Sequence, residues 1–134
     1  MRTLWIALNV LFLAMFLFSV VVQFNDPDPV RWVAIYGFAA IACIGELTRN
    51  ERWSLPAGIC LIALSWAASV AQHVHGVRIG DLFAEFEMKN EMIEQAREAG
   101  GLMIVAVWMA VLTVSAFRRS RRNSPVPSQP TQHA

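Results

Sequence analysis

Apolar residues occur along this chain in four long blocks, with shorter polar stretches between them. The blocks cover residues 4–24, 30–47, 55–71 and 102–117. Crossing about 30 Å of hydrocarbon takes ~20 mostly apolar residues in a helix. Open strands cannot cross lipid, because their backbone groups would be left unpaired. The fourth block is short, but a helix before it can extend it. The pattern therefore predicts four membrane-spanning helices.

A further helix is predicted between the third and fourth blocks, over residues 81–99. Its acidic side chains lie largely opposite an apolar face that repeats at helical spacing, made of Leu82, Phe83, Phe86 and Ile93. Asp81 can cap the first turn. We expect this amphipathic helix to lie along the outer membrane surface with its acids in water. There it would cover the outer end of the bundle, or dock another membrane or periplasmic protein.

Composition agrees with a membrane protein. Of the 134 residues, 56% are hydrophobic and only 16% are charged, with a mean hydropathy of +0.45. A soluble domain has nearer a quarter of its residues charged. We therefore predict an all-α, integral membrane four-helix bundle over residues 1–117, with the lipid bilayer as its first partner. Residues 118–134 are expected to form a basic and then disordered cytoplasmic tail.

Arginines mark one side of the predicted bundle. They occur before the first span, in the second link and in the "RRSRR" run over 118–122, whereas the six acids of the third link offset its basic residues. Basic residues stay cytoplasmic, so both termini are expected inside. Ten arginines against one lysine suggest a GC-rich bacterial genome. The expected location is then a bacterial cytoplasmic (inner) membrane, with the first and third links facing the periplasm.

The predicted bundle interior carries little chemistry. No histidine lies inside a span, which argues against a transmembrane haem protein. Ion pathways need ionisable groups at depth, and only Glu46, near the end of the second span, comes close. Asn9 in the first span is explained by one interhelical hydrogen bond. We predict no cofactor, and we read the arginine run as a topology signal, so no nucleic acid partner is expected.

The first link, "NDPDP" over residues 25–29, reads as a rigid turn. Asp28 is placed to cap the second helix, and Pro29 suits the first helical position, where its missing N–H costs nothing. The residue before a proline avoids helical angles, which favours a turn at Asp26. Arg97, one turn before the fourth span, is expected near the level of Asp26 and Asp28 and could pair with either.

Two stretches resemble the transmembrane protein 220 family of small multi-pass membrane proteins. One is "QFNDPDP" over residues 23–29, followed by Trp32 and Tyr36; the other is "REAGGLMIV" over residues 97–105. The resemblance covers roughly residues 1–117. It implies a four-helix membrane protein of no established molecular activity and supplies no catalytic residues. The family-like positions are Gln23, Asn25, Asp26, Pro27, Asp28, Pro29, Trp32, Tyr36, Arg97, Glu98 and Gly101.

Three functional hypotheses follow. The first is a non-enzymatic protein with a polar site on the periplasmic face that docks a partner or a small ligand, formed by Gln23, Asn25, Asp26, Asp28, Trp32, Tyr36, Arg97 and Glu98. The second is a metal site or metal-dependent enzyme using His73, His75, Asp26 and Asp28, since imidazole with carboxylate suits zinc, copper, nickel or iron. The third is a lipid or quinone binder with a groove beside Trp66.

Overall fold

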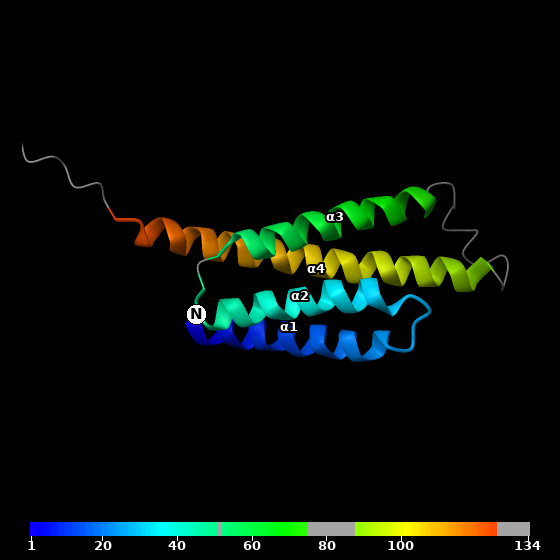
Figure 1. Ribbon diagram of the computed structural model, residues 1–134, viewed down its shortest axis with the longest axis horizontal. Helices are drawn as coiled ribbons and strands as arrows, with labels where there is room; N and C mark the ends of the chain where they lie inside the picture. Colours follow the sequence, from blue (N-terminus) through cyan, green and yellow to red (C-terminus); the bar gives the residue numbers. More distant parts are fainter. Residues whose placement is uncertain (51, 75–87, 126–134) are drawn as a thin grey trace, which may run out of the picture.

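Four α-helices make up the computed structural model, which describes residues 1–50, 52–74 and 88–125 (Figure 1). They are α1 (Arg2–Gln23), α2 (Pro29–Leu47), α3 (Ser54–Val74) and α4 (Met88–Asn123). Each runs antiparallel to the helix before it, so α1 lies beside α2 and α3 beside α4. The first link closes one end of the bundle, which we call the NDPDP end. The other end carries Arg2, Arg49 and Arg119 and is called the basic end.

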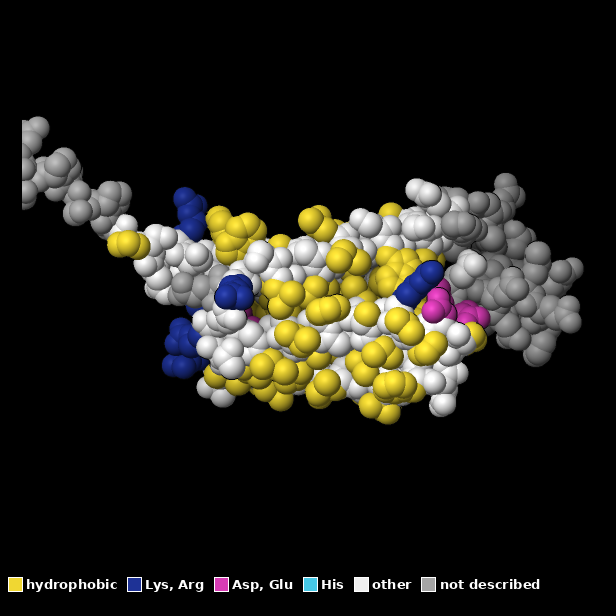
Figure 2. All heavy atoms as spheres, viewed as in Figure 1, with side chains coloured by type: hydrophobic (Ala, Val, Ile, Leu, Met, Phe, Trp, Pro, Cys, Tyr) yellow, Lys and Arg dark blue, Asp and Glu magenta, His cyan; other side chains and the backbone are white. Residues whose placement is uncertain are grey.

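All four helices are long and apolar enough to cross a membrane, so the predicted all-α fold is confirmed, with four candidate spans. The candidate spans are Arg2–Gln23, Pro29–Leu47, Ser54–Gln72 and Arg97–Asn123. Large apolar side chains point outward along their middles, including Leu11, Phe18, Leu61 and Val107. In Figure 2, hydrophobic side chains are spread along the body of the molecule, and most of the Lys and Arg side chains in view lie at the basic end, with one beside the acids at the other end. Such a surface suits lipid as the surrounding solvent.

The structure does not support the amphipathic helix predicted over 81–99 as an element of its own. Residues from Met88 onward belong to α4, which continues without interruption through Gly100 and Gly101 to Asn123. Glycine inside a helix costs only about 1 kcal/mol relative to alanine, and no proline interrupts this stretch. The expected N-terminal extension of the fourth span is thus confirmed. Residues 81–87 lie outside the described part of the chain.

The basic run after the fourth span continues α4 as far as Asn123. Arg121 and Arg122 occupy the last turn of α4, where cations interact favourably with the carbonyl end of the helix dipole. The segment predicted to be disordered falls mostly on residues 126–134, which lie outside the described residues.

The core lies where α2, α3 and α4 meet. Small residues let the backbones approach closely there, as membrane helices require: Ala39, Ala63, Ala67 and Ala106 are buried. The backbones of α1 and α4 make no close contact in the described chain. Aromatic side chains bridge them instead, since Phe12 stacks on Trp108 with 4.0 Å between ring centroids. Asn9 donates a hydrogen bond to the Cys43 carbonyl at 2.8 Å, which confirms its predicted interhelical role.

The two ends of α2 have identifiable capping features. Pro29 begins α2, and Asp28 is its N-cap residue but makes no side-chain cap hydrogen bond. After α2, the Arg49 amide bonds to the Glu46 carbonyl and the Asn50 amide to the Gly45 carbonyl, at 3.1 and 2.8 Å. These two bonds form a Schellman motif. Its left-handed residue is Arg49, with φ of 57°, where glycine is usual.

Candidate functional site

A cleft of about 620 Å³ opens at the NDPDP end between α1, α2 and α4. Seven of the eight residues predicted for the polar site line it, and so does Gly101; the seven are Gln23, Asn25, Asp26, Trp32, Tyr36, Arg97 and Glu98. Three helices and the first link contribute to the wall. The volume is within the range of small-molecule pockets.

The floor of the cleft is aromatic and tightly packed. The Trp32 ring stacks with Tyr36, at 6.1 Å between centroids and an interplanar angle of 24°, and with Trp66, at 4.6 Å and 30°. The Tyr36 side chain also lies against Gly101 of α4, so closely that a Cβ atom there would overlap the Tyr36 hydroxyl oxygen. A larger residue at position 101 would therefore force the Tyr36 ring or α4 to shift.

The polar rim of the cleft carries more negative than positive charge. Asp26 and Glu98 supply carboxylates, and Arg97 supplies one guanidinium. The Glu98 carboxylate is within electrostatic range of both Asp26 and Arg97. Asp26 and Glu98 are partly buried, whereas Arg97 is exposed. Such a rim favours a cation or a zwitterion over an anion.

Asp28 stands apart from the other predicted site residues. It does not line the cleft, and its carboxylate lies 3.4 Å from the Arg31 guanidinium in an exposed pair. In the described chain no ion pair links Arg97 to Asp26 or Asp28. The pairing suggested by the sequence is therefore wrong. The reason is local, because Arg31 lies three residues after Asp28, on the first turn of the same helix.

The predicted metal ligands cannot all be compared with the structure. The His73 side chain and His75 lie outside the described residues, and Asp26 and Asp28 are described. Among the described residues, no three His, Cys, Asp or Glu side chains are grouped as metal ligands. Trp66, proposed to border a lipid or quinone groove, is partly buried and packs against the core.

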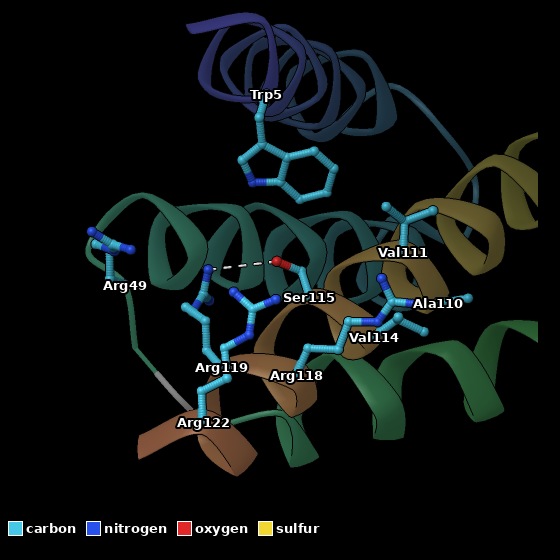
Figure 3. A pocket seen from close by; sticks show the side chains of 9 residues that line it. All are labelled: Trp5, Arg49, Ala110, Val111, Val114, Ser115, Arg118, Arg119 and Arg122. Carbon is cyan, nitrogen blue, oxygen red and sulfur yellow. Dashed lines mark hydrogen bonds between the residues drawn. The ribbon is translucent and has the colours of Figure 1, made fainter. Parts of the chain in front are cut away.

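The basic end holds a polar cluster that the sequence did not reveal. Buried Glu46 of α2 accepts hydrogen bonds from Arg119 Nη1 and Nη2, both at 2.7 Å. Trp5 Nε1 of α1 and Ser115 Oγ of α4 also donate to Glu46 Oε1, at 2.9 and 3.0 Å. Figure 3 shows Arg119 bonded to Ser115, four residues earlier on the same helix. The available signal was a glutamate inside an apolar block, since such groups are usually paired.

Comparisons with known proteins agree with the fold. A model of the family described as transmembrane family 220, helix, matches residues 15–114. Transmembrane protein 220 of Xenopus laevis is 26% identical over 114 residues, covering 81% of this chain. The chain spans 58% of the length of that relative. No solved structure matches the chain.

The family match includes both stretches on which the sequence resemblance was based, residues 23–29 and 97–105. The named relative comes from an animal, so family membership by itself does not indicate a bacterial source. Because the family model covers well over half of the sequence, the resemblance is confirmed, and the chain belongs to transmembrane family 220.

Proposed function

We propose that this chain is a non-enzymatic, multi-pass membrane protein that binds a small polar ligand with a cationic group at its NDPDP end. The observation that carries the proposal is the cleft, which gathers two carboxylates and three aromatic rings from parts of the chain far apart in sequence. A structural turn alone does not require this gathering of groups around an open space.

The chemistry of the wall supports a cationic ligand. Carboxylates of Asp26 and Glu98 can bind an ammonium group through charge-assisted hydrogen bonds. Trp32 and Tyr36 are buried and stack on neighbouring rings, so they supply an apolar wall for the methyl or methylene groups of the ligand. Arg97 lies beside these groups and suits a second, anionic group on the same ligand. A zwitterion of a few heavy atoms meets all three requirements.

We further propose that the NDPDP end faces the periplasm of a bacterial cell and the basic end the cytoplasm. Arg2, Arg49, Arg119 and their neighbours at the basic end support this orientation, and the arginine-rich composition supports the bacterial setting. The site would then sample ligands from outside the cytoplasm.

Ligand binding can be measured on the full chain in mild detergent by thermal shift. The probes are choline, ethanolamine and glycine betaine, with ethylene glycol and acetate as neutral and anionic controls. We expect the unfolding midpoint to rise with at least one cationic or zwitterionic probe and with neither control. Equal responses to all five probes would refute a cation-selective cleft.

Matched variants test whether the thermal shift arises from ligand binding in the cleft. Glu98→Gln and Asp26→Asn each remove one carboxylate from the cleft and should abolish or strongly reduce the shift. Asp28→Asn removes the same charge at the same end but from outside the cleft, and should leave the shift intact. A loss of the shift in Asp28→Asn as large as in Glu98→Gln would assign the effect to general surface charge.

Orientation is tested separately in a Cys43→Ala/Cys60→Ala background. A maleimide that cannot cross the membrane should label Asn25→Cys in intact cells, and should label Ser120→Cys only after the cells are permeabilised. The reverse pattern would place the cleft in the cytoplasm.

A further inference from the structure

A second cavity, of about 670 Å³, lies at the basic end between α1 and α4 (Figure 3). Trp5 projects from α1 toward the space, and four arginines border it: Arg49, Arg118, Arg119 and Arg122. The rest of the wall includes the apolar side chains of Ala110, Val111 and Val114 on α4. The cavity therefore combines a strongly basic part with an apolar part on the neighbouring turns of one helix.

The positive charge of this cavity is not cancelled by described acids. Ion pairs in the described chain join Arg31 to Asp28 and Arg119 to Glu46. Glu46 thus offsets the charge of Arg119. The guanidinium groups of Arg49, Arg118 and Arg122 have no described carboxylate partner and retain their attraction for an anion.

Arg49 lines the cavity although its backbone conformation is unfavourable for an arginine. Its φ of 57° lies in the left-handed region, at the position of a Schellman motif where glycine is favoured. An arginine there costs stability that a glycine would not. The Arg49 side chain forms part of the cavity wall. A glycine at this position would leave that part of the wall without a guanidinium group.

The apolar part of the wall lies on the surface of α4 that would be in contact with lipid. Val111 and Val114 are 37% and 50% exposed, although they lie within the last candidate span. Trp5 lies near the start of the first span, at the level where tryptophans sit at the boundary between hydrocarbon and headgroups. A free anion would need the arginines but not the adjoining apolar surface.

We propose that this cavity binds an anionic phospholipid from the surrounding leaflet. Its phosphate group lies among Arg49, Arg118 and Arg122, and one acyl chain lies over Val111 and Val114. Basic pockets between helices at the membrane surface suit such headgroups. The bound lipid lies beside Trp5 of α1 and the last turns of α4, next to the aromatic contacts that join the two helices.

Native mass spectrometry of the full chain in mild detergent tests the proposal. The probes are phosphatidylglycerol, phosphatidylcholine with the same acyl chains, and glycerol 3-phosphate. We expect phosphatidylglycerol to bind about a hundredfold more tightly than phosphatidylcholine, since each of the three arginines near an anionic headgroup contributes a factor of roughly five. Equal affinity for the two lipids would overturn the proposal. Glycerol 3-phosphate binding as tightly as the lipid would also overturn it, in favour of a free-anion site.

Charge variants separate the cavity from the general basic surface. Arg118→Gln/Arg122→Gln should weaken phosphatidylglycerol binding about 25-fold. Arg2→Gln/Arg121→Gln removes the same charge from the same end, outside the cavity, and should change binding by less than about twofold. Equal losses in the two double variants would indicate diffuse attraction and overturn the site.

Two more variants keep the test decisive if a charge variant fails to fold. Val114→Trp fills the apolar wall without altering charge and should reduce lipid binding, because the side chain is half exposed and leaves the core intact. Arg49→Gly should unfold no more readily than the natural chain yet bind the lipid less well. Unchanged lipid binding in both variants would overturn the assignment.

Discussion

Glu46 and its partner Arg119 form an ion pair in which one member is enclosed and the other reaches the surface. The exposed fractions of the two side chains are 4% and 20%. They lie 73 positions apart in the sequence and connect α2 to the end of α4. Trp5 donates to the same carboxylate, so α1 is tied to the pair as well.

Because the two side chains differ in exposure, we expect their removal to lower the unfolding free energy by different amounts. Arg119→Met leaves a buried carboxylate without its counter-charge and should cost about 3 kcal/mol of unfolding free energy. Glu46→Gln should cost less, about 1 kcal/mol, because the freed guanidinium can turn toward water and the amide oxygen still accepts from Trp5. Unfolding in mixed detergent and SDS micelles measures both.

The double variant provides the control for that prediction. Glu46→Gln/Arg119→Met removes the uncompensated charge and should recover much of the stability lost in Arg119→Met. Arg121→Met, on the same helix turn, should cost less than about 0.5 kcal/mol. Strictly additive losses in the cycle would show that the ion pair does not couple the two positions.

The sequence predicted the helices well because lipid imposes both their length and their composition. The second block, residues 30–47, differs from α2 by one residue at its start. The amphipathic helix over 81–99 is not supported as an element of its own, because its described part, from Met88, continues through Gly100 and Gly101 as α4. An apolar block predicts that a membrane-spanning helix is present. It does not predict how far that helix continues into the polar sequence beside it.

The site was harder to predict, because it depends on which helix faces meet. The family-like motifs identified Tyr36 and Gly101 individually, yet nothing in the sequence indicated that one covers the other. The Glu46 and Arg119 pair was missed for the same reason: both were visible as charged residues at block ends, but their pairing depends on helix rotation. Asp28 was included because it is adjacent in sequence, whereas its side chain pairs with Arg31.

The contact of Tyr36 with Gly101 predicts a stability penalty that a second substitution relieves. Gly101→Ala should lower the unfolding free energy by about 1 kcal/mol, because overlap with the tyrosine hydroxyl outweighs the gain in helix propensity. Adding Tyr36→Phe removes the overlapping oxygen and should restore stability. Gly100→Ala, where an added Cβ meets no atom within 4 Å, is the matched control and should not destabilise. SDS unfolding compares all four proteins; no rescue by Tyr36→Phe would refute the steric account.

Asp28 is predicted to contribute little to stability. It makes no side-chain cap hydrogen bond, and its pair with Arg31 is exposed, with 63% of the Asp28 side chain accessible. Asp28→Asn and Asp28→Ala should each change the unfolding free energy by less than about 1 kcal/mol. Pro29→Ala, which changes the first helical residue itself, serves as a comparison. A large loss in Asp28→Ala that Asn prevents would reveal a cap that forms only in the membrane.

The aromatic bridge between α1 and α4 gives the last prediction. Phe12 stacks on Trp108 with an interplanar angle of 7°, and Trp108 also packs against Trp5 at 5.7 Å. Because the backbones of α1 and α4 are not in close contact in the described chain, these rings carry much of the association. Phe12→Ala should therefore cost about 2 kcal/mol through lost packing. Phe18→Ala, on the same helix but 69% exposed to the surrounding lipid, should cost less than about 0.5 kcal/mol. SDS unfolding of the two variants gives the comparison, and equal losses would mean that the stacked ring contributes no more than any lipid-facing phenylalanine.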